Sequence, residues 1–387
     1  MSQTAILLLI AFFESFVTIL DERSSYFFCK ERLGFGSAEN LWLALTFGGG
    51  YVLAAWRAHW LSSRIGERRQ LALVIAVLVG VHVWLFFHVS PAIMFAAMAL
   101  LGLANGAKWP VLEGFLASGL TPSQTAKVMG RFNITWAAAV PLALAASGPL
   151  IAIHPTALFV VGGSASLASL VLAFCLPRRP DAPIEALLDA DRHEHPEHLA
   201  GLLVASRWVM LAVYISVFVF APLAPRIFER LGCSGQLAPA TSGVLDVMRL
   251  GAFVTLGLWR GWRGRARWLG LTICALPVGF FMVILGSNLT VVMIGEMLFG
   301  FAAGMSYSSA MYCAMVVKEA SVDAGGGHES MIGLGLMIGP LAGLVGDSIH
   351  TATGSFTQGY VIAMAPVLGI CIAAALWAIS KRPVGSQ

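Results

Sequence analysis

The chain has 387 residues, of which 58% are hydrophobic and only 11% charged, with a formal net charge of +4. A typical soluble domain carries about 25% charged residues, and the mean hydropathy of this chain is +0.81. These figures exclude an ordinary soluble domain, because a soluble core has too little room for so much apolar surface. The small net charge gives no reason to expect nucleic acid as a partner. We therefore expect an all-α protein that spans the lipid bilayer.

Twelve apolar segments follow one another along the chain, each close to the roughly 20 residues that cross a bilayer. The first segment lacks the basic region and the cleavage site of a signal peptide, so we expect it to be retained. The segments are 4–29, 38–58, 70–88, 91–118, 129–152, 155–176, 201–225, 239–259, 268–286, 289–317, 328–349 and 357–380.

One long polar stretch near the middle divides six segments from six. It predicts a first bundle in residues 1–176, a linker at 177–200 and a second bundle in 201–387. His193, His195 and His198 in this linker could bind a divalent metal. We interpret the stretch as a solvated linker and expect no metal and no cofactor. Lys and Arg gather in the loops on the side of both termini, which predicts cytoplasmic termini in an inner or plasma membrane.

The two halves share a repeat. The string Glu31-Arg32-Leu33-Gly34 recurs 198 residues later as Glu229-Arg230-Leu231-Gly232. Further matches occur in order at the same offset: Gly66 with Gly264, Arg69 with Arg267, Gly102 with Gly300, and Gly106 with Gly304. Such a repeat predicts two pseudo-symmetric six-helix bundles.

The loop after the second segment reads Ser63-Arg64-Ile65-Gly66-Glu67-Arg68-Arg69. It resembles the loop signature of the major facilitator superfamily, usually written G-x-x-x-D-R-x-G-R-R, and Arg260-Gly261-Trp262-Arg263-Gly264-Arg265 is similar in the second half. The resemblance implies twelve transmembrane helices in two bundles and transport by alternating access. It also implies a gating role for the loop residues Arg64, Gly66, Arg68, Arg69, Gly264 and Arg265.

The chain departs from that family's pattern at two places. Ser63 stands where the family has an acidic residue in the loop. Gly102 stands where the family's fourth span carries an Arg, four residues before a Gly, which is Gly106 here. The resemblance therefore does not extend to proton antiport by the usual arginine scheme.

Ionisable side chains within the apolar segments are functional candidates, because placing one in a membrane costs about 2.5–3.5 kcal/mol. Glu14 and Asp21 are seven residues apart, so a helix would put both on nearly one face. We expect them to couple transport to protons, together with Asp246. Lys108 could neutralise Glu14, pair with Glu113 or bind a substrate anion.

The candidates for substrate binding are cationic, amide and aromatic side chains in the segments. They are Asn105, Lys108, Trp109, Asn133, Trp136, Arg249 and Tyr307. Asp246 and Arg249 are three residues apart and could equally form a local neutral pair. Glu22 and Arg23 could form the outer edge of the first span, and we interpret His82 as a packing or interfacial residue.

These observations favour a secondary active transporter for a small organic solute, with the proton as the candidate coupling ion. The sequence contains no ATP-binding P-loop. We expect a monomer in the bilayer and no enzymatic activity. Two alternatives use the same fold: a lipid or lysolipid flippase, and a drug exporter, since Gly148-Pro149 is similar to a signature of exporters in that family. A polytopic membrane enzyme is the alternative from another class.

Overall fold

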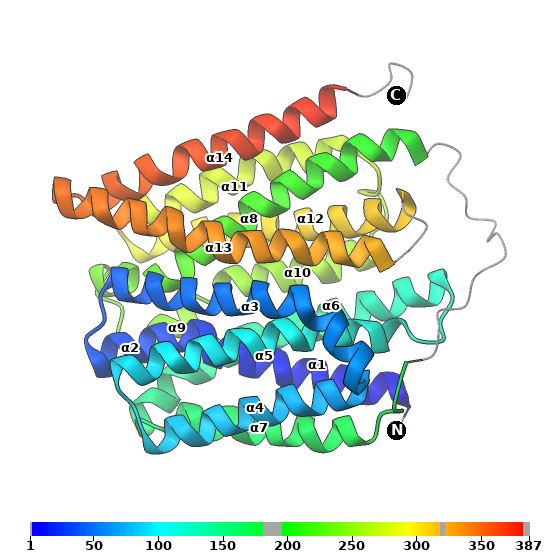
Figure 1. Cartoon of the computed structure of the whole chain (residues 1–387). Coiled ribbons are helices and arrows are strands. Elements are labelled where there is room, and N and C mark those ends of the chain that lie inside the picture. Colours follow the sequence, from blue (N-terminus) through cyan, green and yellow to red (C-terminus); the bar gives the residue numbers. More distant parts are fainter. Residues whose placement is uncertain (1, 181–195, 318–321, 382–387) are drawn as a thin grey trace. The chain divides into compact units, whose positions relative to one another are not determined.

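The computed structural model describes residues 2–180, 196–317 and 322–381 (Figure 1). Within these ranges every regular element is a helix, which confirms the predicted all-α class. All twelve predicted segments coincide with helices, and eleven helical stretches of the described chain are long and apolar enough to cross a membrane. Helix α3 (Ser37–Ile65) is the exception, because Arg57, His59 and Arg64 reduce its hydropathy.

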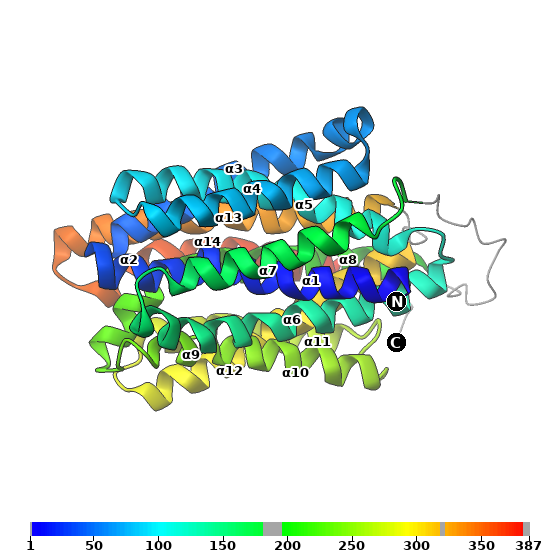
Figure 2. The same ribbon diagram turned by 90° about the horizontal axis from the view of Figure 1, so that it is seen from below.

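The first of two compact units comprises Met1–Glu185 and Ala221–Gly243. Within it α3 packs along α5, α4 along α7, and α1 along α6 (Figure 2). Besides α3, the elements of this unit are α1 (Gln3–Ile19), η1 (Leu20–Ser24), α2 (Ser25–Leu33), α4 (Glu67–Phe87), α5 (Pro91–Ala117), α6 (Pro122–Ile153), α7 (Ala157–Phe174) and α9 (Ala238–Thr241).

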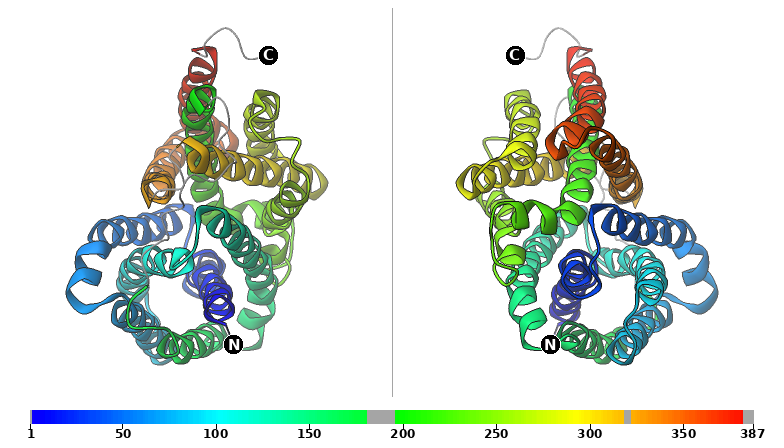
Figure 3. Two further views of the ribbon diagram at one scale, coloured as in Figure 1. Left: turned by 90° about the vertical axis from the view of Figure 1, so that its right-hand side faces the viewer. Right: turned by 90° about the vertical axis from the view of Figure 1, so that its left-hand side faces the viewer.

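The second unit comprises Ala186–Phe220 and Val244–Gln387, so α8 (Pro196–Arg230) contributes residues to both units. In this unit α10 and α11 pack on α12, and α13 packs on α14 (Figure 3). Besides part of α8, the helices of this unit are α10 (Val244–Leu258), α11 (Ala266–Leu285), α12 (Leu289–Val317), α13 (Val322–Thr353) and α14 (Phe356–Ser380). Several helices extend beyond the predicted segments, and α8 begins at Pro196, inside the predicted linker. Segment 239–259 breaks at Ser242 and Gly243.

Matched glycine contacts support the sequence repeat. A Cβ on Gly102 would collide with the carbonyl of Phe47, and one on Gly300 would collide with the carbonyl of Leu245. Phe47 and Leu245 are themselves 198 residues apart. Helices α3 and α5 in one unit, and α10 and α12 in the other, therefore meet at equivalent points where only hydrogen fits.

The turns repeat as well. Gly34 and Gly232, the last residues of the repeated four-residue string, have φ of 69° and 68° after α2 and α8. Gly66 and Gly264, in the two basic loops, have φ of 86° and 67°. A positive φ favours glycine, which explains why these glycines are retained in both halves.

Candidate functional site

A buried ion pair joins α1 to α5 in the first unit. The Lys108 Nζ lies 2.8 Å from the Glu14 Oε2, and both side chains are fully shielded from solvent. The other carboxylate oxygen of Glu14, Oε1, is buried without a hydrogen-bond partner. Two charges taken out of water are retained in a fold only with a close partner. This contact selects Glu14 from the three predicted partners of Lys108.

Thr18 extends this pair along α1. The Lys108 Nζ lies 3.4 Å from the Thr18 hydroxyl, which lies 2.7 Å from both the Asn105 Oδ1 and the Glu14 carbonyl oxygen. The Asn105 amide donates to the Leu101 carbonyl over 2.9 Å, which sets the side-chain orientation. Thr18 was not predicted, because a threonine hydroxyl in an apolar span usually bonds only to its own helix.

Aromatic rings flank the lysine. The Lys108 Nζ lies 4.8 Å from the centre of the Trp109 ring, within the range of a cation–π interaction. Trp109 in turn meets Phe132 of α6 edge-on, with ring centres 6.4 Å apart. Near Phe132 on α6, the Trp136 Nε1 donates to the Asn133 Oδ1 over 3.1 Å. The predicted residues Lys108 and Trp109 thus lie together, and Asn133 and Trp136 form a neighbouring pair on α6.

Asp21, the second predicted carboxylate of α1, has a different partner. Its Oδ1 lies 2.8 Å from the Nε2 of His82 in α4, and both side chains are buried. Two glycines of α7 make room for the imidazole: a Cβ on Gly162 would lie 2.5 Å from the His82 Nε2, and one on Gly163 would lie 3.1 Å from the His82 Cβ. The interpretation of His82 as a packing or interfacial residue is therefore incomplete.

The π-helical turn η1 and the first residue of α2 bury five consecutive polar residues, Asp21 to Ser25. Arg23 donates to the Ser242 carbonyl over 3.1 Å, at the break between α9 and α10, and Ser24 bonds to Ser147 of α6. Glu22 is buried as well, so the prediction that Glu22 and Arg23 form an outer edge is wrong. The apolar run gave no sign of these interactions, because their partners lie on other helices.

The basic loop of the first unit makes contacts of its own. The Arg68 guanidinium donates to the Leu176 carbonyl over 3.0 Å, just past the end of α7. Arg64 lies over the Trp60 ring, 4.3 Å from its centre, and the Arg69 side chain is exposed. Arg68 thus fastens the start of α4 to the chain that follows α7.

The second unit has its ion pair within a single helix. The Arg249 guanidinium lies 2.6 Å from the Asp246 Oδ1, one turn away on α10. Tyr307 of α12 packs on Phe253, with ring centres 5.3 Å apart. The local pair that we considered for Asp246 and Arg249 is present. Phe253, the partner of Tyr307, lies two turns after Asp246 on α10.

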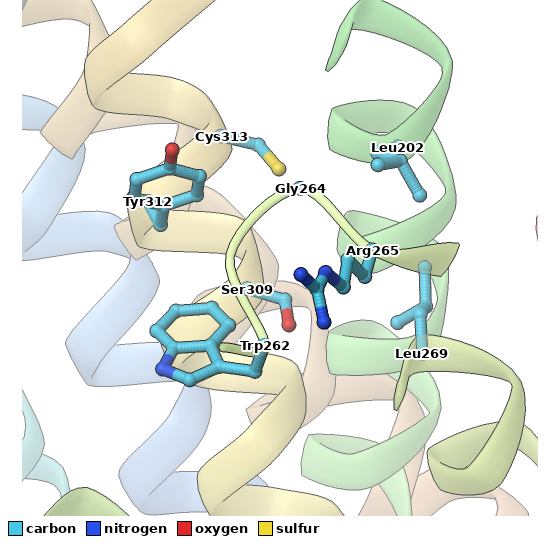
Figure 4. Close-up of a pocket in the computed structure, with 8 residues that line it drawn as sticks. All are labelled: Leu202, Trp262, Gly264, Arg265, Leu269, Ser309, Tyr312 and Cys313. Atoms are coloured by element: carbon cyan, nitrogen blue, oxygen red, sulfur yellow. The ribbon is translucent and has the colours of Figure 1, made fainter. Parts of the chain in front are cut away.

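Gly264 and Arg265 line a small pocket in the second unit (Figure 4). Trp262 and Tyr312 lie on one side of the loop in this view, and Leu202 and Leu269 on the other. The pocket has about 10 Å³ of free space, roughly what one water molecule needs. It is too small for an organic solute, which agrees with a structural part for this loop.

Some predicted features lie outside the described residues. The linker histidines His193 and His195 belong to them, and nothing is described of the His198 side chain. Among the residues that the structure describes, no cluster of three His, Cys, Asp or Glu side chains could hold a metal ion.

Two units of apolar helices with a repeated contact pattern, each with an ion pair buried inside it, define a polytopic membrane transport protein. The family model of the Major Facilitator Superfamily matches residues 4–326. The chain therefore belongs to this superfamily, whose members are secondary transporters and not enzymes, and it is an integral membrane protein. A search of curated proteins found no match.

Solved transporter structures share the fold. A variant of the nucleoside transporter NupG has a TM-score of 0.72 and 12% identity, with 97% of this chain and 100% of that chain covered. A D-xylose-proton symporter has a TM-score of 0.71 and 13% identity, with 98% of this chain and 97% of that chain covered. A third structure is a bacterial homolog of the human lysosomal transporter Spinster in an inward-facing and occupied conformation. It has a TM-score of 0.71 and 13% identity, with 99% of this chain and 98% of that chain covered. Identities this low establish the fold alone.

Proposed function

We propose that this transporter moves a small organic solute with an anionic group together with a proton. The observation that carries this proposal is the 2.8 Å ion pair between Lys108 and Glu14, buried at the contact of α1 and α5. An ionised pair inside a membrane span is expensive, and such pairs mark substrate and ion pathways.

The pair couples two binding events. While Glu14 is ionised, it neutralises Lys108, and an anionic solute gains little from the ammonium group. A proton that binds Glu14 releases the charge of Lys108 for the solute anion. Binding of either ligand therefore favours the other, as linkage requires, and proton and anion cross together without net charge. The unpartnered Glu14 Oε1 is a position where this proton can bind.

The neighbouring side chains supply the remaining contacts to the solute. Trp109 offers an aromatic face beside Lys108, and Asn105 is held there by Thr18. Asn133 and Trp136 follow on α6. We assign Arg249 and Tyr307 to further contacts with the solute, and Asp246 to the neutralisation of Arg249. We propose a monomer with both termini in the cytoplasm, since Lys and Arg gather in the loops on that side.

The test uses purified protein in proteoliposomes that contain a pH-sensitive dye. A thermal-shift screen of organic anions, nucleosides and pentoses first identifies a solute that binds. In the wild type, a gradient of that solute should drive protons in the same direction. Glu14→Gln should lower the number of protons that move with each solute and spare solute exchange. Lys108→Ala should weaken binding of the anion by about 2 kcal/mol, roughly 30-fold.

Two variants serve as matched controls. Glu31→Gln and Lys127→Ala remove the same charges at exposed positions and should behave as the wild type. Wild-type uptake and pH dependence in both Glu14→Gln and Lys108→Ala would contradict the proposal. A lysolipid or an uncharged drug as the only transported compound would favour the flippase or the exporter that the sequence left open.

A further inference from the structure

The hydrogen bonds of His82 restrict where its protons lie. The Nδ1 lies 2.7 Å from the Leu78 carbonyl oxygen, one turn earlier on α4. A carbonyl only accepts, so the Nδ1 carries a hydrogen. The Nε2 lies 2.8 Å from the Asp21 Oδ1, a distance that requires a hydrogen between the two atoms.

That second hydrogen can sit on either atom. On the Nε2 it makes an imidazolium beside a carboxylate, and on the Oδ1 it makes a neutral imidazole beside a carboxylic acid. Both arrangements have the same number of protons and no net charge, so Asp21 and His82 hold this proton jointly. Removal of the shared proton would leave a net charge of −1 in a buried place, at a high desolvation cost.

A further atom points to proton binding. Asp21 is only 3% exposed, and its second carboxylate oxygen, Oδ2, is buried without a hydrogen-bond partner. Asp21 also lies in the π-helical turn η1, and such turns are frequent at functional sites.

Other charges around the pair are accounted for. Helix α7, which packs along α4, has no ionisable residue, and the acidic and basic side chains of α3 and α6 are exposed. The remaining ones are on α1, η1, α2, α5 and the ends of α4. They are Glu14, Glu22, Arg23, Tyr26, Cys29, Lys30, Glu31, Arg32, Lys108, Glu113, Glu67, Arg68, Arg69 and His88. Glu14 is bound to Lys108, and Arg23 binds the Ser242 carbonyl.

We propose that Asp21 and His82 form a second proton-binding site of this transporter, separate from Glu14 and Lys108, that holds one proton between the Oδ1 and the Nε2 and releases it once per transport cycle. The proton enters from one aqueous side, binds the pair as a neutral unit and leaves to the other side. The role of this pair in the transport cycle rests on the proposed function, whereas proton binding by the pair does not.

The first measurement is nitrogen NMR of the detergent-solubilised protein with ¹⁵N-labelled histidine. The chain has nine histidines, so the signals of His82 are assigned by their loss in His82→Gln. We expect a protonated Nδ1, and an Nε2 that shares its proton in the wild type and loses it in Asp21→Asn. His88→Gln, on the same helix at an exposed position, should leave the His82 signals unchanged. His82 signals that are unchanged in Asp21→Asn would overturn the proposal, because they would show that no proton lies between the two residues in the wild type.

The second measurement is the proton-to-solute ratio, taken from the pH gradient that just balances a solute gradient in proteoliposomes. Asp21→Asn and His82→Gln should each lower this ratio by one proton, while Glu14→Gln lowers it through the first site. An unchanged ratio in folded Asp21→Asn protein would overturn the role in transport. If the NMR shows a shared proton at His82 but Glu14→Gln keeps the wild-type proton-to-solute ratio, only the proposed function is contradicted. If the NMR shows no shared proton at His82 and Glu14→Gln lowers the ratio, only the second site is contradicted.

Discussion

Helix α5 of the first unit and α12 of the second occupy equivalent places in their units, yet α5 carries Lys108 where α12 carries Ser306. At the same offset of 198 residues, Glu14 corresponds to Ala212 and His82 corresponds to Phe280. The glycine contacts between helices are repeated, whereas the buried charges are not. The scaffold is thus a shared solution to packing, whereas each half has its own set of buried charges.

The ion pairs of the two units differ in the same way. The pair of Glu14 and Lys108 joins two helices over 94 residues of sequence, and that of Asp246 and Arg249 spans three residues of one helix. A link between helices responds when those helices move, and a link within one helix does not. This difference is the reason that we place the coupling reaction in the first unit.

The largest expected effect tests this difference directly. Lys108→Met should lower the free energy of unfolding by about 3–5 kcal/mol, because it leaves Glu14 buried without its cation. Adding Glu14→Gln should restore most of that loss. The same cycle with Arg249→Met and Asp246→Asn should give a smaller coupling, of about 1 kcal/mol, since this pair lies within one helix and does not link two helices. Unfolding midpoints in detergent measure both cycles, and equal coupling energies would refute the comparison.

An intermediate effect tests what the halves share. Gly102→Ala and Gly300→Ala should each destabilise the protein by about 1–3 kcal/mol, because each new methyl meets a carbonyl of the neighbouring helix. Gly114→Ala is the matched control on α5, where nothing lies within 4 Å of an added Cβ. It should stabilise by about 0.5–1 kcal/mol through helix propensity. A change of the same sign at Gly102 and Gly114 would count against the contact.

The smallest effect concerns an exposed pair. Lys30 Nζ lies 2.8 Å from Glu229 Oε2 within the first unit, with the two side chains 27% and 51% exposed. Glu229→Gln should change the free energy of unfolding by less than about 1 kcal/mol, because water and salt screen exposed charges. Thermal unfolding at low and high ionic strength provides the measurement. A loss as large as that in Lys108→Met would mean that distance, and not burial, governs these pairs.

Sequence alone predicted the helices, the two halves and their repeat. Apolar runs can be read directly, since a chain in lipid must satisfy its backbone within each helix and can do so only by helix formation. The offset between Gly102 and Gly300, and between Gly34 and Gly232, could be read for a similar reason: a missing Cβ is a local property that appears in the sequence itself.

Only the tertiary structure decided which charges meet. Helical spacing placed Glu14 and Asp21 on one face, but Glu14 pairs with α5 and Asp21 with α4, 61 residues away. His82 offered no pattern that would connect it to Asp21, and Thr18 and Arg23 offered none for their partners. The partner of a buried side chain depends on which helices pack together and on the π-helical turn at Leu20–Ser24, and neither is encoded in local spacing.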